Sequence, residues 1–130
     1  MGEITGLAHI GMSVEDLDRS KEFYTSVLGF EIYHECVVEG GLRVAFARLH
    51  DCRLEMVENR KPGNETAGCF GHLALKVSNI EEVRETLAER GIEFTTDEIV
   101  YAKEVFPPGG SKWILFHGPD GELLEINEVQ

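Results

Sequence analysis

Basic side chains are scarce in this chain. Its 130 residues include 12 lysines and arginines against 24 aspartates and glutamates, so the formal net charge is −12. A surface of that sign repels phosphate backbones and anionic lipid headgroups. We therefore expect neither nucleic acid nor a membrane as a partner.

Cysteines and long apolar runs are also few. The three cysteines, an odd number without a CxxC motif, favour reduced thiols over a disulfide framework: Cys36, Cys52 and Cys69. No apolar stretch approaches the roughly 20 residues of a transmembrane helix, and the N-terminus lacks the layout of a signal peptide. The sequence predicts a cytoplasmic protein, and its 42% hydrophobic content can fill an ordinary core.

The most informative feature present is an internal duplication. His9 and Glu55 in the first half correspond to His72 and Glu125 in the second, at offsets of 63 (72 − 9) and 70 (125 − 55) residues. The segment HIGMSV at 9–14 matches HLALKV at 72–77, and further matches are Leu17 with Ile80, Gly29 with Gly91 and Phe46 with Phe116. A repeat of about sixty residues indicates a doubled supersecondary unit.

Hydrophobic periodicity predicts the same order of elements twice: a strand, a helix and three strands. In the first half these elements cover 4–14, 16–28 (a helix ended by Gly29), 30–38, 43–49 and 53–58. In the second half they cover 70–77, 79–90 (a helix begun by a Ser78-x-x-Glu81 capping box), 92–101, 112–117 and 122–128. We expect an α+β protein with a single domain over 1–130, made of half-modules at about 4–60 and 69–129.

Strand alternation places the repeated residues on one face. Glu55 stands between Leu54 and Met56, so its side chain points away from the apolar face, and Glu125 stands between two apolar neighbours in the same way. If helices cover the apolar faces, both histidines and both glutamates lie on the uncovered side. A single such residue is more often solvated or hydrogen-bonded, but the match between halves favours a metal site. Two imidazoles and two carboxylates suit Zn, Ni, Co, Fe or Mn and leave positions for water or substrate.

Several stretches resemble the vicinal oxygen chelate superfamily, which includes glyoxalase I, methylmalonyl-CoA epimerase, fosfomycin-resistance transferases, extradiol dioxygenases and bleomycin-resistance proteins. These stretches are HIGMSVEDLDRS at 9–20, FYTSVLGF at 23–30, GHLAL at 71–75 and GPDGELLE at 118–125. The resemblance implies two tandem βαβββ modules that form a curved mixed sheet with a concave metal-binding face. Matched position by position, it implies the four metal ligands of glyoxalase I: His9, Glu55, His72 and Glu125.

The choice within the superfamily depends on Glu55. The transferases and dioxygenases lack a carboxylate at this position, and methylmalonyl-CoA epimerase usually has glutamine there, so the resemblance is closest to glyoxalase I. It implies a metal-dependent lyase or isomerase of small carbonyl compounds that acts through a metal-stabilised enediolate. The carboxylate of Glu125 or Glu55 is then the catalytic base that moves the proton.

Other functions and partners stay open at this stage. Ser13 stands where glutathione-dependent members carry an arginine, which leaves the thiol cosubstrate open, and Asn59 matches an asparagine that contacts glutathione but is equally typical of a turn. The alternatives are an epimerase-like or dioxygenase-like metalloenzyme and a metal-free binding protein of the bleomycin-resistance type. Short members of the superfamily pair their modules between chains, so we expect a homodimer that binds a small-molecule substrate. Its metal sites should lie at or near the interface, formed within one chain or across two.

Overall fold

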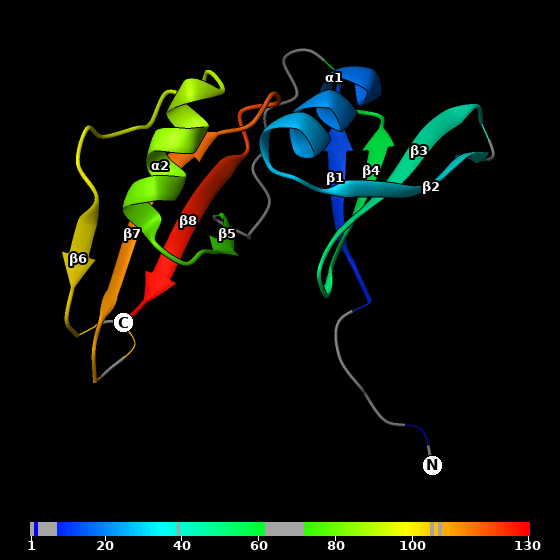
Figure 1. Ribbon diagram of the computed structural model, residues 1–130. Helices are drawn as coiled ribbons and strands as arrows, with labels where there is room; N and C mark the ends of the chain where they lie inside the picture. The colour runs from blue at the N-terminus through cyan, green and yellow to red at the C-terminus, as the bar shows by residue number, and fades with distance from the viewer. Residues whose placement is uncertain (1, 3–7, 39, 62–71, 105, 107) are drawn as a thin grey trace. The chain divides into compact units, whose positions relative to one another are not determined.

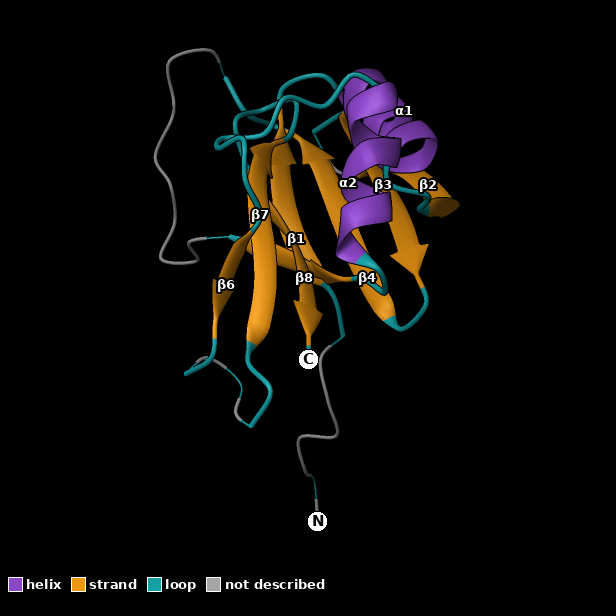
Figure 2. Cartoon of the chain, turned by 60° about the vertical axis from the view of Figure 1, so that its left-hand side comes forward, coloured by secondary structure: helices purple, strands orange, loops and turns teal. Residues whose placement is uncertain are grey.

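The computed structural model describes residues 2, 8–38, 40–61, 72–104, 106 and 108–130. The chain divides into two compact units, Met1–Glu65 and Thr66–Gln130 (Figure 1). Each unit contains a four-stranded mixed sheet and a helical segment, and Figure 2 distinguishes the strands from the helices by colour. The predicted α+β class and the two tandem modules are confirmed. In the described part of the chain, no helix is long and apolar enough to cross a membrane.

The first unit has the predicted order of elements. They are β1 (Ile10–Val14), α1 (Leu17–Glu22), the π-helical segment η1 (Phe23–Val27), β2 (Glu31–Val38), β3 (Leu42–Leu49) and β4 (Cys52–Glu58). The sheet order is β1-β4-β3-β2, in which β1 runs parallel to β4 and the other neighbours are antiparallel. The chain thus begins and ends the module on neighbouring strands.

The second unit repeats this arrangement. Its elements are β5 (Leu73–Lys76), α2 (Ile80–Glu89), β6 (Val100–Ala102), β7 (Ser111–His117) and β8 (Leu123–Val129). The sheet order β5-β8-β7-β6 is the same as in the first unit, again with one parallel pair, β5 and β8, and antiparallel pairing elsewhere. The duplication seen in the sequence is therefore a duplication of topology.

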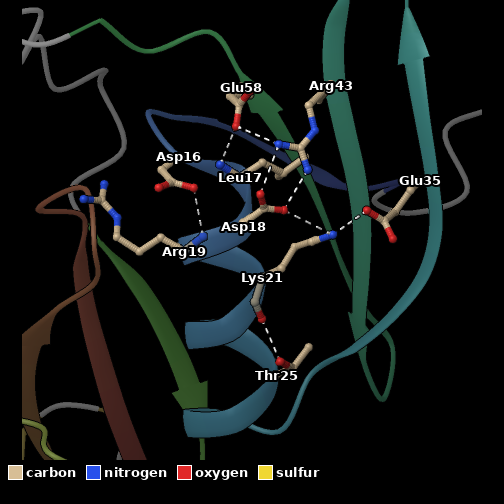
Figure 3. Close-up of polar contacts among 9 residues, drawn as sticks. All are labelled: Asp16, Leu17, Asp18, Arg19, Lys21, Thr25, Glu35, Arg43 and Glu58. Atoms are coloured by element: carbon tan, nitrogen blue, oxygen red, sulfur yellow. Dashed lines mark hydrogen bonds and ion pairs between the residues drawn. The ribbon is translucent and has the colours of Figure 1, made fainter.

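The helical segment of the first unit changes its hydrogen bonding midway. The Thr25 hydroxyl donates to the Lys21 carbonyl oxygen at 2.7 Å, a local bond that competes with regular helix formation (Figure 3). The Leu28 N–H then donates to the Phe23 carbonyl oxygen, five residues back. Gly29, at a φ of 85°, ends the segment at the predicted residue.

Two predictions in the second unit need correction. The strand expected over 92–101 is limited to β6 and an isolated bridge between Phe94 and Phe116, because the stretch around Thr96 and Asp97 makes local polar contacts instead of a ladder. The N-cap of α2 is Asn79 rather than Ser78. Asparagine tolerates the left-handed φ of 53° found here, and its side chain exchanges hydrogen bonds with Glu82. Predicted strand residues 4–7 and 70–71, and Cys69, lie outside the described residues.

The buried side chains of each unit come from its helical segment and from strand positions that alternate with the candidate ligands. In the first unit they include Val14, Leu17, Tyr24, Ala45, Ala47, Leu54 and Met56, and in the second Ile80, Leu87, Ile114, Phe116, Leu124 and Ile126. This register corrects one predicted match between the halves. Phe46 pairs with Glu55 on the ligand face, whereas Phe116 pairs with Leu124 in the core, so the counterpart of Phe46 is Leu115.

Helix α1 is held to its sheet by polar contacts of Asp18 and Lys21 (Figure 3). The Arg43 guanidinium on β3 lies 2.7 Å from an Asp18 carboxylate oxygen and 3.4 Å from Glu58. Lys21 lies 2.6 Å from Glu35 on β2. These contacts connect the helix to three strands and leave the opposite face of the sheet for the candidate site.

Candidate functional site

In the first unit, the structure brings His9 and Glu55 together. Gly11 on β1 pairs with Glu55 on β4, and His9 lies two residues before Gly11, hence on the same face. The His9 Nε2 and Glu55 Oε2 atoms are 4.0 Å apart, with side chains 44% and 29% exposed. The parallel pairing of the first and last strands therefore brings together two residues that are far apart in sequence.

The second unit brings His72 and Glu125 together in the same manner. Ala74 pairs with Glu125, and His72 lies two residues before Ala74. The His72 Nε2 and Glu125 Oε2 atoms are also 4.0 Å apart, but the Glu125 side chain is only 11% exposed. In both units the histidine therefore lies at the same position relative to the glutamate in the strand pairing, and the same distance separates the two side chains.

Each pair fits half of a metal centre. A distance of 4.0 Å is too long for a hydrogen bond. Two ligands at about 2.1 Å from one tetrahedral metal lie about 3.4 Å apart, so a small rotation of an exposed imidazole would suffice. The described residues contain no group of three or more His, Cys, Asp and Glu side chains that could hold a metal. Within its described residues, each unit therefore offers one imidazole and one carboxylate as candidate donors.

The carboxylate of Glu125 has additional support that the sequence did not reveal. The Asn127 Nδ2 group donates to Glu125 Oε2 at 3.1 Å, and the buried Ser111 hydroxyl donates to Asn127 Oδ1 at 2.9 Å. This chain of donors fixes the orientation of one Glu125 oxygen. The equivalent of Asn127 in the first unit is Val57, and no amide or hydroxyl of the described residues donates to Glu55. The two glutamates therefore differ in the hydrogen bonds that orient them.

Aromatic side chains line the Glu55 side of the first sheet. The Phe46 ring, paired with Glu55, has its centroid 6.4 Å from that of His9, 5.7 Å from that of His34 and 6.1 Å from that of Tyr33. The register between β2 and β3 shifts between Ile32 and His34, which places both Tyr33 and His34 beside Phe46. Strict alternation along a strand predicts that the side chains of these two neighbours point in opposite directions. Sequence periodicity therefore could not predict that both lie beside Phe46.

A cavity of about 480 Å³ adjoins the first pair, and its lining residues are Ala8, His9, Ile10, Asp51, Cys52 and Arg53. This volume is in the range of small-molecule sites. Burial, with a smaller contribution from the Asp51 charge, raises the pKa of the Cys52 thiol, which therefore stays protonated at neutral pH and is a poor nucleophile. Any reaction or binding in this cavity is therefore expected to use His9 and Arg53 rather than the Cys52 thiol.

Two residues considered for thiol recognition lie near the end of the first module. Ser13 is exposed on β1 and pairs with Val57. Asn59 follows β4 directly, and its backbone N–H donates to the Val57 carbonyl oxygen at 2.9 Å. This contact makes Asn59 a turn residue whose exposed side chain stays available.

The sequence is similar to a known protein family and to several known enzymes. Residues 6–126 match the family model described as Glyoxalase/Bleomycin resistance protein/Dioxygenase superfamily. Lactoylglutathione lyase from Salmonella typhimurium is 32% identical over 136 residues, which cover 95% of this chain and 93% of that enzyme. Mitochondrial methylmalonyl-CoA epimerase from Bos taurus is 26% identical over 134 residues, which cover 95% of this chain and 74% of that protein.

The fold comparison agrees. The crystal structure of a glyoxalase family protein from Enterococcus faecalis superposes with a TM-score of 0.78 at 29% identity, covering 95% of this chain and 98% of that one. A family model that spans almost the whole chain and a relative above 30% identity support the same assignment. The chain belongs to the Glyoxalase/Bleomycin resistance protein/Dioxygenase superfamily.

Proposed function

We propose that this protein is a glyoxalase I-like, metal-dependent lyase or isomerase of small carbonyl compounds. The observation that carries the proposal is the His–Glu pair, repeated with a 4.0 Å separation in each unit. We assign His9, Glu55, His72 and Glu125 as the ligands of one divalent transition metal. Similarity to lactoylglutathione lyase over nearly the full length supports this choice.

The four residues have separate tasks in this proposal. A bound divalent cation would offset the negative charge that develops on the substrate oxygens when a proton leaves the neighbouring carbon. The imidazoles of His9 and His72 would hold the cation through a ring nitrogen. One glutamate accepts the proton and returns it to the adjacent carbon, which is the isomerisation step. Asn127 donates a hydrogen bond to Glu125, whereas no amide or hydroxyl of the described residues donates to Glu55.

Metal content is the first test. Protein purified without chelator should contain about one divalent transition metal per chain, because the four donors form one set. His9→Ala and His72→Ala should each remove most of it, since the loss of one ligand strongly reduces affinity. His50→Ala is the control, because His50 lies in the turn between β3 and β4. Full occupancy in both ligand variants would refute the assignment.

The reaction class is tested by proton exchange in deuterated water. The metal-loaded protein is offered 2-oxoaldehyde–thiol adducts, 2-hydroxyketones and acyl-CoA thioesters, and exchange of the carbon-bound proton is followed by NMR. Exchange on the adducts or hydroxyketones is the expected result. Absence of exchange on every compound would contradict a proton-transfer enzyme and favour an oxygen-dependent or purely binding role.

A methylmalonyl-CoA epimerase-like activity is the second candidate. The epimerase from Bos taurus is similar over most of this chain, and epimerisation also removes a proton from a carbon beside a carbonyl. Exchange confined to the acyl-CoA thioesters would favour this candidate over the first.

We also propose that the protein is a homodimer whose metal ligands come from one chain or from two. Each unit supplies only one His–Glu pair, so two units must cooperate at each metal. Light scattering of the metal-loaded protein at micromolar concentration should give twice the chain mass. A monomer that retains its metal would show that one chain completes the site alone.

A further inference from the structure

Two arginines lie directly opposite each other on the ligand face of the first sheet. Arg48 on β3 pairs with Arg53 on β4, and Arg53 is two residues from Glu55. His9 is also a neighbour of Arg53, because the next residue, Ile10, pairs with Leu54. Like charges in a cross-strand pair destabilise a sheet. In a chain with a net charge of −12, this pairing calls for an explanation.

The two guanidinium groups share the ring of Tyr33. The Cζ atoms of Arg48 and Arg53 lie 5.4 and 5.6 Å from the ring centroid. Arg48 is neutralised by Glu31, with contacts of 3.3 and 3.4 Å. Arg53 donates to the His50 carbonyl oxygen at 2.9 Å and has no carboxylate within ion-pair distance among the residues that the structure describes. Its charge is therefore available to a ligand.

Arg53 faces a space that a ligand can occupy. It lines the cavity of about 480 Å³ together with His9, one of the proposed metal ligands. Asp51 lies at the same cavity and is exposed, so it opposes anions less than a buried carboxylate would. An anionic group beside Arg53 would thus lie next to the proposed catalytic residues.

The second unit shows that the fold does not require this cation. The residue equivalent to Arg53, 70 positions later, is Leu123, and the residue paired with Leu123 is His117 rather than an arginine. The same sheet position is filled by an apolar side chain in one module and by a cation in the other. Arg53 is consequently a specific property of the first module.

We propose that Arg53, supported by Tyr33, is an anion-binding subsite that takes a carboxylate or phosphate group of the substrate. The planar guanidinium matches two oxygens of either group, and stacking on Tyr33 holds the guanidinium in place. The position of the reacting carbonyl near His9 and Glu55 rests on the proposed function. Anion binding itself needs only the first unit.

The test is a calorimetric titration of chelator-treated, full-length protein with inorganic phosphate and, separately, with acetate. The variant Arg53→Leu introduces the residue of the second module and should weaken binding of the preferred anion about tenfold. The comparison of phosphate with acetate identifies the group that the site prefers. Tetramethylammonium should not bind to the same site.

Arg84→Leu is the matched control. Arg84 also lies over an aromatic ring, 5.4 Å from the Phe94 centroid, and also donates to a backbone carbonyl oxygen, that of Asp97. The variant carries the same change of charge and should leave anion affinity within about twofold. Equal weakening of anion binding in both variants would mean that only the net charge matters, and would overturn the proposal. Absence of saturable anion binding by the parent protein would also overturn it.

Two further measurements separate this inference from the proposed function. Arg53→Leu should lose the anion and keep the metal, whereas His72→Ala should lose the metal and keep the anion. Anion binding that depends on Arg53 in a protein without metal affinity would refute the proposed function alone. If Arg53→Leu does not fold, the variant Arg53→Lys is titrated in its place. In addition, the NMR shifts of the His9 and Cys52 amides are followed while anion is added to the parent protein. Unmoved amides at saturating anion would refute the subsite.

Discussion

Glu58 and Glu128 make the same contact in the two modules. Glu58 at the end of β4 accepts a 2.7 Å hydrogen bond from the Leu17 backbone N–H, and Glu128 near the end of β8 accepts from the N–H groups of Asn79 and Ile80 at 2.9 and 3.2 Å. Each glutamate follows the proposed metal-binding glutamate of its strand by three residues, on the opposite face. One strand therefore positions both the helix and the ligand.

Removal of this contact should destabilise the module. Glu58→Ala leaves the Leu17 N–H at the start of α1 without its carboxylate partner and takes one partner from Arg43. We expect the free energy of unfolding to fall by about 1 kcal/mol, as for the loss of a helix cap. Urea unfolding followed by circular dichroism measures it. Glu93→Ala, in an exposed position between α2 and β6, should change the stability far less.

The Asp18–Arg43 ion pair predicts a pH dependence in acid. The hydrogen bond from Arg43, with its charge, lowers the pKa of Asp18 below the ordinary value of 3.8. A carboxyl with a lowered pKa in the folded state stabilises the protein above its unfolded pKa, and this contribution is lost as the pH falls through the folded value. Asp18→Asn should therefore weaken the decline of stability below about pH 4. The effect will be small, because the Asp18 side chain is 69% exposed. A variant as acid-sensitive as the parent at every pH would contradict this prediction.

Asn127 is expected to influence metal affinity although it is not a ligand. Asn127→Val introduces the residue of the first module, Val57, and removes the donor that orients Glu125. Loss of such a donor typically weakens metal binding by about tenfold or more. Competition with a chromogenic chelator gives the affinity. An unchanged dissociation constant in a folded variant would show that the Ser111–Asn127–Glu125 contacts are only structural.

The two glutamates should respond differently to amide substitution. Glutamine can coordinate through oxygen but cannot accept a proton at neutral pH. We expect Glu125→Gln to weaken metal binding and abolish proton exchange. Glu55→Gln should be milder, because no amide or hydroxyl of the described residues orients Glu55 as Asn127 orients Glu125. Exchange is measured in metal-saturated samples. The reverse ranking would identify Glu55 as the base.

The His–Glu pairs could be predicted from the sequence because they depend on period-two alternation and on one repeat offset. Their surroundings could not. The bulge that turns Tyr33 and His34 toward the same neighbour depends on pairing between β2 and β3, which no local pattern encodes. The Asn127 contact depends on Ser111 from an adjacent strand. The cap at Asn79 instead of Ser78 reflects a left-handed backbone that only the folded turn selects.

The parallel pairing of the first and last strands ties each donor pair to the completion of folding. His9 and Glu55 are 46 residues apart (55 − 9), and His72 and Glu125 are 53 apart (125 − 72), so neither pair exists until a long loop has closed. Such late, non-local contacts slow folding. Metal added during refolding would therefore bind after the rate-limiting step, leaving the folding rate almost unchanged and slowing unfolding. Under the proposed function, metal content would therefore measure how many molecules have finished folding.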